Sequence, residues 1–165
     1  MKYLIFIIIL LFYFPSYAQQ VRSNFTLELG LGLSLTHYDN NENPRIGMTL
    51  PSLSLGMFFN DNMAVMFRGS STSYFEGAKQ IIFGLYGIHL QVWLSDKFFI
   101  SGGPGLSLFT KPQPMSGFGF GIRGGYSLVT WEDSSLHISF EFLPGFFKGN
   151  RKIFGEALMI EWQWL

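Results

Sequence analysis

The chain has 165 residues, of which 13% are charged, 18% are aromatic and none is cysteine, and its formal net charge is zero. The lack of cysteine excludes a disulfide framework and a thiolate metal site, and the neutral charge balance argues against nucleic acid as a partner. Soluble domains usually carry about 25% charged residues. So few charges beside 19 Phe indicate that much of the outer surface does not face water.

The first 18 residues have the features of a secretory signal peptide. Lys2 precedes an apolar run at 3–14 that is too short to span a bilayer as a helix, and Pro15 and a small-x-small site at 16–18 follow it. We therefore expect cleavage after Ala18, with a retained N-terminal anchor as the alternative. No later segment has 18 consecutive apolar residues, so we expect no transmembrane helix.

The segment 24–36 alternates strictly between apolar and small or polar residues. Large apolar side chains occupy the odd positions from Phe25 to Leu35, whereas Gly, Ser, Thr and Glu28 occupy the even positions. Successive side chains of a strand point to opposite faces, so this pattern predicts a strand with one apolar and one polar face.

Seven further segments show the same alternation. They are 46–59, 63–74, 80–94, 98–109, 117–131, 136–147 and 153–165. The apolar phase changes at Pro51, which predicts a β-bulge, and Pro104 predicts a second irregularity. Eight strands with hairpin-length connections predict an all-β fold, an eight-stranded antiparallel up-and-down β-barrel formed by residues 19–165.

The connections differ in length at the two ends of the predicted barrel. Three short turns with a central Asp, at 60–62, 95–97 and 132–134, recur at intervals of 35 and 37 residues. The longer connections are at 37–45, 75–79, 110–116 and 148–152. Short turns at one end and longer loops at the other are typical of the periplasmic and outer faces of an outer-membrane barrel.

Residue size predicts which face is inside. The polar face consists mostly of small residues that suit the narrow interior of an eight-stranded barrel, and the apolar face has the composition of a lipid-facing surface. Aromatic residues near the strand ends predict two girdles at the membrane interfaces. Beside the short turns and the C-terminus these are Trp93, Trp131, Trp162 and Trp164, and beside the loops they are Tyr38 and Tyr74.

The signal peptide, the alternating strands, the short one-sided turns and the aromatic end resemble the small outer-membrane β-barrel family that includes the OmpA transmembrane domain and OmpX. The resemblance implies an outer-membrane location and insertion by the barrel-assembly machinery. That machinery recognises a C-terminal aromatic residue in the family. Here the last alternating series ends on Trp164, with Leu165 beyond it.

Seven ionisable residues have inward parity and form the candidate site. They are Glu28, Arg68, His89, Arg123, His137, Glu141 and Glu161. Isolated charges in a narrow interior are costly, so we expect the arginines to pair with the glutamates. Glu28 and Glu161 lie on strands that must be neighbours if the barrel closes, so they need a shared cation or a shared proton. A structural plug is the first interpretation, and a narrow ion channel is the alternative.

The pattern His137-x-Ser139 resembles the His-x-Ser of outer-membrane lipid A deacylases. In that family an Asn follows the Ser and a Glu orients the His. Here Phe140 stands at the Asn position, and Glu156 is the nearest candidate for the Glu, toward the opposite end of the barrel. The sequence therefore favours a non-enzymatic protein, with a lipid A-modifying enzyme as an alternative.

The overall expectation is an integral outer-membrane barrel with a structural or surface-interaction role and a plugged polar lumen. The expected partners are outer-membrane lipid and lipopolysaccharide, whose phosphates the basic loop at 148–152 could contact. We expect no cofactor and a monomer, and no His, Asp and Glu set has metal-site spacing. A soluble lipocalin-type barrel is a further alternative, which the polar inward face disfavours.

Overall fold

A computed structural model of the chain describes residues 25–38, 43–111 and 113–165. The predicted signal peptide lies outside the described residues. Among the residues that are described, no helix is long and apolar enough to cross a membrane.

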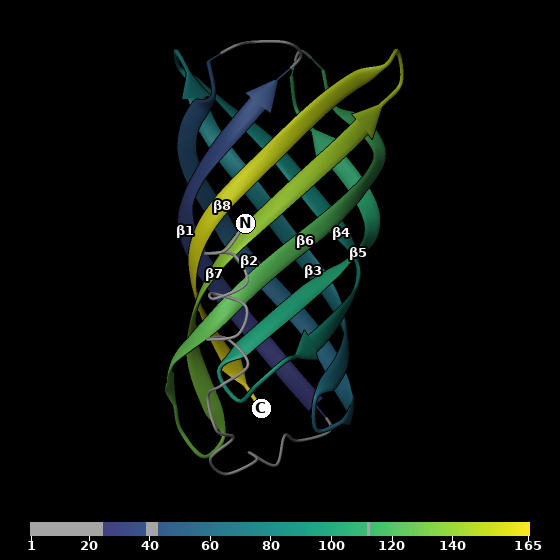
Figure 1. Cartoon of the computed structure of the whole chain (residues 1–165). Coiled ribbons are helices and arrows are strands. Elements are labelled where there is room, and N and C mark those ends of the chain that lie inside the picture. The colour runs from purple at the N-terminus through teal and green to yellow at the C-terminus, as the bar shows by residue number, and fades with distance from the viewer. Residues whose placement is uncertain (1–24, 39–42, 112) are drawn as a thin grey trace, which may run out of the picture.

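Eight antiparallel strands form a closed barrel in sequence order (Figure 1). They are β1 (Phe25–Tyr38), β2 (Arg45–Asn60), β3 (Met63–Glu76), β4 (Lys79–Trp93), β5 (Phe98–Phe109), β6 (Met115–Thr130), β7 (Ser134–Phe147) and β8 (Arg151–Trp164). The barrel closes between β1 and β8, which pair from Leu27 opposite Trp164 to Tyr38 opposite Ile153. The predicted fold class and strand count are therefore confirmed.

The register shows where the strands are irregular. The pairing of β2 shifts by one residue against β1 between Ser52 and Met48, and against β3 between Leu50 and Leu53, so the predicted bulge at Pro51 is present. By contrast, β5 keeps one register with β6 through Pro104, so the predicted irregularity at this residue is absent from that pairing. A further shift lies between Ser127 and Val129 of β6.

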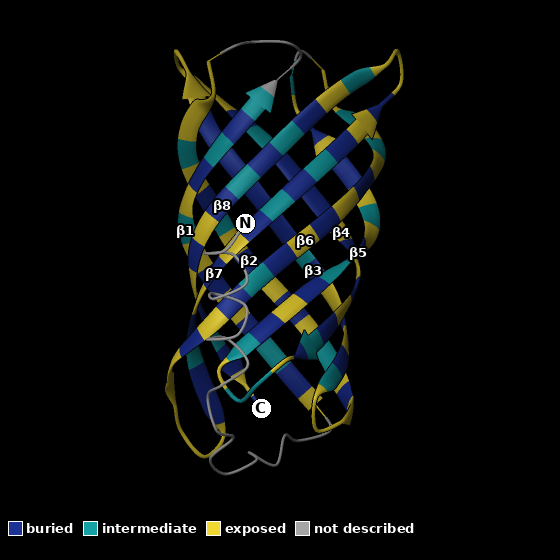
Figure 2. Cartoon of the chain, in the orientation of Figure 1, coloured by how far each residue is buried: buried dark blue, intermediate teal, exposed yellow. Residues whose placement is uncertain are grey.

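Burial alternates along the strands, as Figure 2 shows. The apolar side chains of β1 face outward, with Leu31 57% and Leu33 64% exposed, whereas Thr26, Glu28 and Ser34 are buried. Large exposed hydrophobic side chains occur on every strand. The outer surface is therefore an apolar belt, and the polar face of each strand looks into the barrel.

The interior is arranged in layers along the barrel axis. Toward the loop end, one apolar cluster contains Tyr74, Ile81, Phe83, Leu85, Phe109, Leu143, Phe147 and Ile153. Toward the turn end, a second contains Phe58, Ala64, Met66, Trp93, Phe99 and Leu165. The expectation of a lumen lined by small and polar residues therefore holds only for the layer between these two clusters.

Candidate functional site: a charged cluster inside the barrel

Five charged residues from five strands meet in the middle layer. Their positions follow from the alternation, because each has the parity of its strand's inward face. All five side chains are buried, with exposed fractions of 0% or 1%. They are Glu28 of β1, Arg68 of β3, Arg123 of β6, Glu141 of β7 and Glu161 of β8. We call these five residues the charged cluster.

Arg68 contacts all three glutamates of the charged cluster. Its Nε donates to Glu141 Oε1 at 2.7 Å, its Nη1 to Glu28 Oε1 at 2.5 Å and its Nη2 to Glu161 Oε1 at 2.8 Å. Nη1 also donates to Ser54 Oγ at 2.8 Å. Hydrogen bonds between charged groups are about twice as strong as neutral ones. Arg68 thus links its own strand, β3, to four others, which are β1, β2, β7 and β8.

Arg123 joins two of the same carboxylates from the opposite wall. Its Nη1 donates to Glu28 Oε1 and, at 2.8 Å, to Glu161 Oε1, and its Nη2 donates to Gln91 Oε1 at 2.8 Å. The guanidinium carbon lies 4.8 Å from the centroid of the Phe99 ring, so a cation–π contact ties the charged cluster to the apolar layer at the turn end. Arg68 and Arg123 each contact both Glu28 and Glu161. The two carboxylates therefore share cations, which was one of the two expected arrangements.

The carboxylates of the charged cluster differ in how many of their oxygens accept hydrogen bonds. Both oxygens of Glu141 accept hydrogen bonds, from Arg68 and from Ser70 Oγ. Glu28 accepts all of its hydrogen bonds through Oε1, and its buried Oε2 has no partner among the described residues. Removing one member of a buried ion pair leaves the other charge uncompensated, which costs about 3–5 kcal/mol. The charged cluster is therefore a strongly coupled unit that holds opposite walls together.

The two predicted inward histidines are buried but differ from the charged cluster in their contacts. His89 is 1% exposed, and neither ring nitrogen has a hydrogen-bond partner among the described residues. His137 Nε2 lies 2.8 Å from Ser135 Oγ and Nδ1 lies 3.2 Å from Ser127 Oγ. The His137 ring also packs 5.4 Å from the Trp93 ring, in the apolar layer at the turn end.

The arrangement needed for a His-Ser-Glu catalytic triad is not assembled among these residues. Glu156 lies on β8 opposite Phe142, whereas His137 lies opposite Glu161, five residues further along β8. The Glu156 carboxylate instead faces His37 Nε2 at 3.6 Å. Ser139 and His137 share the inward face, but the hydroxyls at the His137 ring nitrogens are those of Ser127 and Ser135.

The apolar layers contain residues that the sequence interpretation assigned wrongly. Trp93 and Tyr74 were predicted to form membrane girdles, but each is 3% exposed and lies inside the barrel. Both residues have inward parity, Trp93 on β4 and Tyr74 on β3, so the alternation of side chains predicts their position correctly. Nearness to the strand ends does not. The same parity would have placed Phe83, Phe99 and Phe109 inside.

Three of the predicted girdle residues do face outward at the turn end. The Trp131 and Trp162 rings stack at 4.8 Å between centroids, and Trp162 lies 6.0 Å from Trp164. The side chain of Tyr38 lies outside the described part of the chain. An outward aromatic cluster therefore exists at the short-turn end of the barrel.

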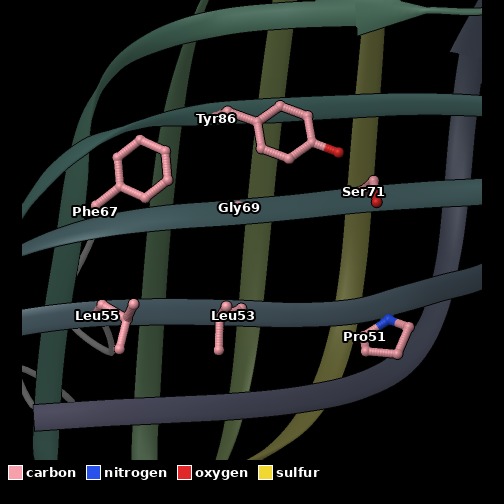
Figure 3. Close-up of a pocket in the computed structure, with 7 residues that line it drawn as sticks. All are labelled: Pro51, Leu53, Leu55, Phe67, Gly69, Ser71 and Tyr86. Carbon is pink, nitrogen blue, oxygen red and sulfur yellow. The ribbon is translucent and has the colours of Figure 1, made fainter.

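A groove on the outer face of the barrel lies over Gly69 (Figure 3). Its volume is about 170 Å³. Its lining comes from β2, β3 and β4: Pro51, Leu53, Leu55, Phe67, Gly69, Ser71 and Tyr86. A Cβ on Gly69 would lie 3.0 Å from the Tyr86 ring, so the ring covers the position that a side chain would fill. The groove belongs to the apolar belt, and none of its lining residues is a member of the charged cluster.

The described residues contain no group of three or more His, Cys, Asp or Glu that could hold a metal ion. The charged side chains in the interior make ion pairs and hydrogen bonds with one another. Both serve to join strands.

The closed, eight-stranded, up-and-down barrel with an apolar outer belt defines the fold of the small outer-membrane β-barrel proteins. Neisserial surface protein A has a TM-score of 0.67 and 12% identity over 86% of this chain and 97% of that chain. The attachment invasion locus protein Ail of Yersinia pestis has a TM-score of 0.55 and 12% identity over 87% and 100%. The N-terminal barrel domain of Pseudomonas aeruginosa OprF has a TM-score of 0.51 and 12% identity over 86% and 98%.

No protein-family model matches the chain, and no curated protein matches it by sequence. The similarity to the solved barrels therefore rests on the fold alone.

Proposed function

We propose that this protein is an integral outer-membrane barrel with an interior closed to ions and solutes, which acts through its outer surface and not as a channel or an enzyme. The observation that carries the proposal is the layering of the interior. An ion-paired cluster lies between two apolar clusters, and the strands contribute to these layers from all around the barrel.

The outer surface supports placement in a membrane. Large apolar side chains are exposed on all eight strands, and water-soluble monomers rarely expose so large a continuous apolar area. The strands have 12 to 16 residues, and a tilted strand needs about 9–11 to cross a bilayer. The strands are therefore long enough to cross the hydrocarbon core and to continue beyond it.

The packing of the apolar layers supports a closed interior. At the loop end, Phe83 makes edge-to-face contacts with Phe109 and Phe147, with ring centroids 6.5 Å and 6.4 Å apart. Each such pair contributes about 0.5–1.5 kcal/mol beyond its buried area. An ion that passed this layer would lose its hydration without gaining polar partners.

Planar-bilayer recording of the purified, refolded protein tests the closed interior. We expect no large, stable openings from the wild type. The double substitution F83A/F109A removes two rings from the loop-end layer and should increase the frequency of brief openings. The matched substitution F118A/F120A removes two outward rings of β6 and should leave the record unchanged. Large, stable openings of the wild type would contradict the proposal.

Membrane integration needs a separate test. We expect the protein to fractionate with outer membranes and to migrate on a gel differently before and after heating, as folded barrels do. Recovery in the soluble periplasmic fraction would favour the soluble-barrel alternative instead.

A further inference from the structure

The charges at the two ends of the barrel differ in sign. Among the described residues, the turn end carries Lys97 and four acidic residues, which are Asp61, Asp96, Glu132 and Asp133. The loop end carries Glu76, Glu156 and six basic residues, which are Arg45, Lys79, Lys111, Lys148, Arg151 and Lys152. The loop end therefore favours an anionic partner, and the turn end disfavours one.

The two acidic residues that the structure describes at the loop end already have cationic or histidine partners. Glu76 pairs with Lys111 and, at 3.8 Å, with Arg45, and Glu156 faces His37. In contrast, no acidic side chain of the described residues lies within ion-pair distance of Lys148, Arg151 or Lys152. The uncompensated positive charge is thus concentrated on the hairpin between β7 and β8, which lies at the upper right of Figure 1.

The backbone of this hairpin turn holds its basic residues in a defined arrangement. The connection between the paired residues Phe147 and Arg151 has three residues, and two of them, Gly149 and Asn150, have positive φ values of 79° and 60°. Arg151 lies opposite Phe147 and its Nη1 contacts Met115 Sδ at 3.5 Å. Lys148 and Lys152 are exposed. The short connection therefore fixes the backbone positions of two exposed lysines at the rim of the barrel.

The outer face directly below these lysines is aromatic. Lys152 lies opposite Phe146, which is exposed on the same outward face. Further down, the rings of Phe142 and Phe154 are parallel, with centroids 6.0 Å apart and 5° between their planes. Glu156 is four residues from Lys152 along β8, about 13 Å at the rise of a strand. Positive charge thus lies immediately above an aromatic surface, whose lower edge is at Glu156, opposite Phe142.

From this arrangement we infer that the β7–β8 hairpin binds the phosphate of a phosphorylated lipid of the outer leaflet, with its acyl chains against Phe142, Phe146 and Phe154. A soluble phosphate would use the lysines but not the aromatic surface, and a neutral lipid would use the surface but not the lysines. The inference rests on the proposed membrane location and names the lipid class that the surface recognises.

The test uses the purified full-length barrel in neutral detergent micelles, after heat-modifiable migration has established that it is folded. Diphosphoryl lipid A is titrated in, and bound lipid is measured by native mass spectrometry. A basic side chain near an anionic lipid surface contributes about 1 kcal/mol, which is about fivefold in affinity. We therefore expect K148Q/K152Q to bind about 25-fold more weakly.

The matched control is K79Q/K97Q, which removes the same net charge at sites away from the hairpin. We expect its affinity to stay within about twofold of the wild type. Equal losses in the two double variants would overturn the inference, since attraction would then depend on net charge alone.

Two further ligands test whether both the phosphates and the acyl chains of lipid A are needed for binding. Lipid A without its phosphates should bind much more weakly, and inorganic diphosphate should not compete at concentrations comparable to the lipid. Equal binding of the dephosphorylated lipid, or effective competition by diphosphate, would contradict the inference while leaving the membrane location intact. A protein that binds no lipid of any kind and remains soluble without detergent would instead contradict the proposed function.

Discussion

Arg68 and Glu141 form a two-bond contact across the lumen, from Nε to Oε1 at 2.7 Å and from Nη2 to Oε2 at 3.4 Å. The two residues lie on β3 and β7, which are not neighbours in the barrel. Backbone pairing joins each strand only to its neighbours, so this side-chain contact braces opposite walls.

The first prediction concerns this brace. Replacing Arg68 by Met should destabilise the barrel by about 3–5 kcal/mol, because the buried Glu141 then loses its guanidinium partner and Glu28 and Glu161 keep only Arg123. R68K keeps the positive charge but not the several N–H donors of the guanidinium group, so its loss of unfolding free energy should be smaller than that of R68M. Denaturant unfolding of the refolded variants in micelles measures both. A loss for R68M no larger than that for an exposed substitution such as K97Q would show that the charged cluster does not support the fold.

The second prediction compares two glutamates of the charged cluster. Glu141 uses both carboxylate oxygens, whereas Oε2 of Glu28 has no partner among the described residues. E28Q should therefore lower the free energy of unfolding less than E141Q does. The same unfolding assay ranks the two variants, and the reverse order would show that the hydrogen bonds of Glu141 are not the stronger set.

The third prediction uses two adjacent glycines of β6. A Cβ on Gly125 would lie 2.2 Å from Phe99 Cζ, whereas a Cβ on Gly124 would meet nothing within 4 Å. G125A should therefore displace the Phe99 ring, weaken its contact with Arg123 and cost about 1–3 kcal/mol. G124A should be neutral and is the matched control. Unfolding midpoints that are equal for the two variants would contradict the tight packing at Phe99.

The fourth prediction concerns pH at the loop end. The hydrogen bond from Lys111 lowers the pKa of Glu76 from its ordinary value of 4.5, with further lowering from the positive charges of Lys111 and Arg45. The Glu76 carboxylate therefore contributes its stabilising contact above pH 4.5, and this contribution is lost as the pH falls through the lowered pKa. An NMR titration should find that K111Q raises the pKa of Glu76, whereas an unchanged pKa would exclude Lys111 as the cause.

The fifth prediction concerns the enzyme alternative. H137A leaves the Ser127 and Ser135 hydroxyls without their ring partner, so we expect a loss of stability of about 1–3 kcal/mol. Mass spectrometry of lipid A from expressing cells should find the same acyl chains with wild type, H137A and an empty vector. Loss of an acyl chain with wild type but not with H137A would reverse our view of this histidine.

The amino-acid sequence by itself determined the strands, their number and which side chains face inward. The reason is local: a strand alternates its side chains, so parity follows from the residue pattern without knowledge of neighbours. Glu28, Arg68 and Arg123 were placed inside on this basis. Trp93 and Tyr74 lie near strand ends, where a membrane girdle is expected, but their inward parity places both inside the barrel.

Only the tertiary structure decided which inward residues meet. Height in the lumen depends on register, and a bulge such as that at Pro51 shifts every residue beyond it. Closure then brings together residues far apart in sequence, so that Thr26 Oγ1 donates to the Trp164 carbonyl at 2.6 Å. The register between strands that are far apart in sequence decides which layer each inward residue joins. It also brings Arg68 and Glu141 into contact. No local sequence pattern encodes this register.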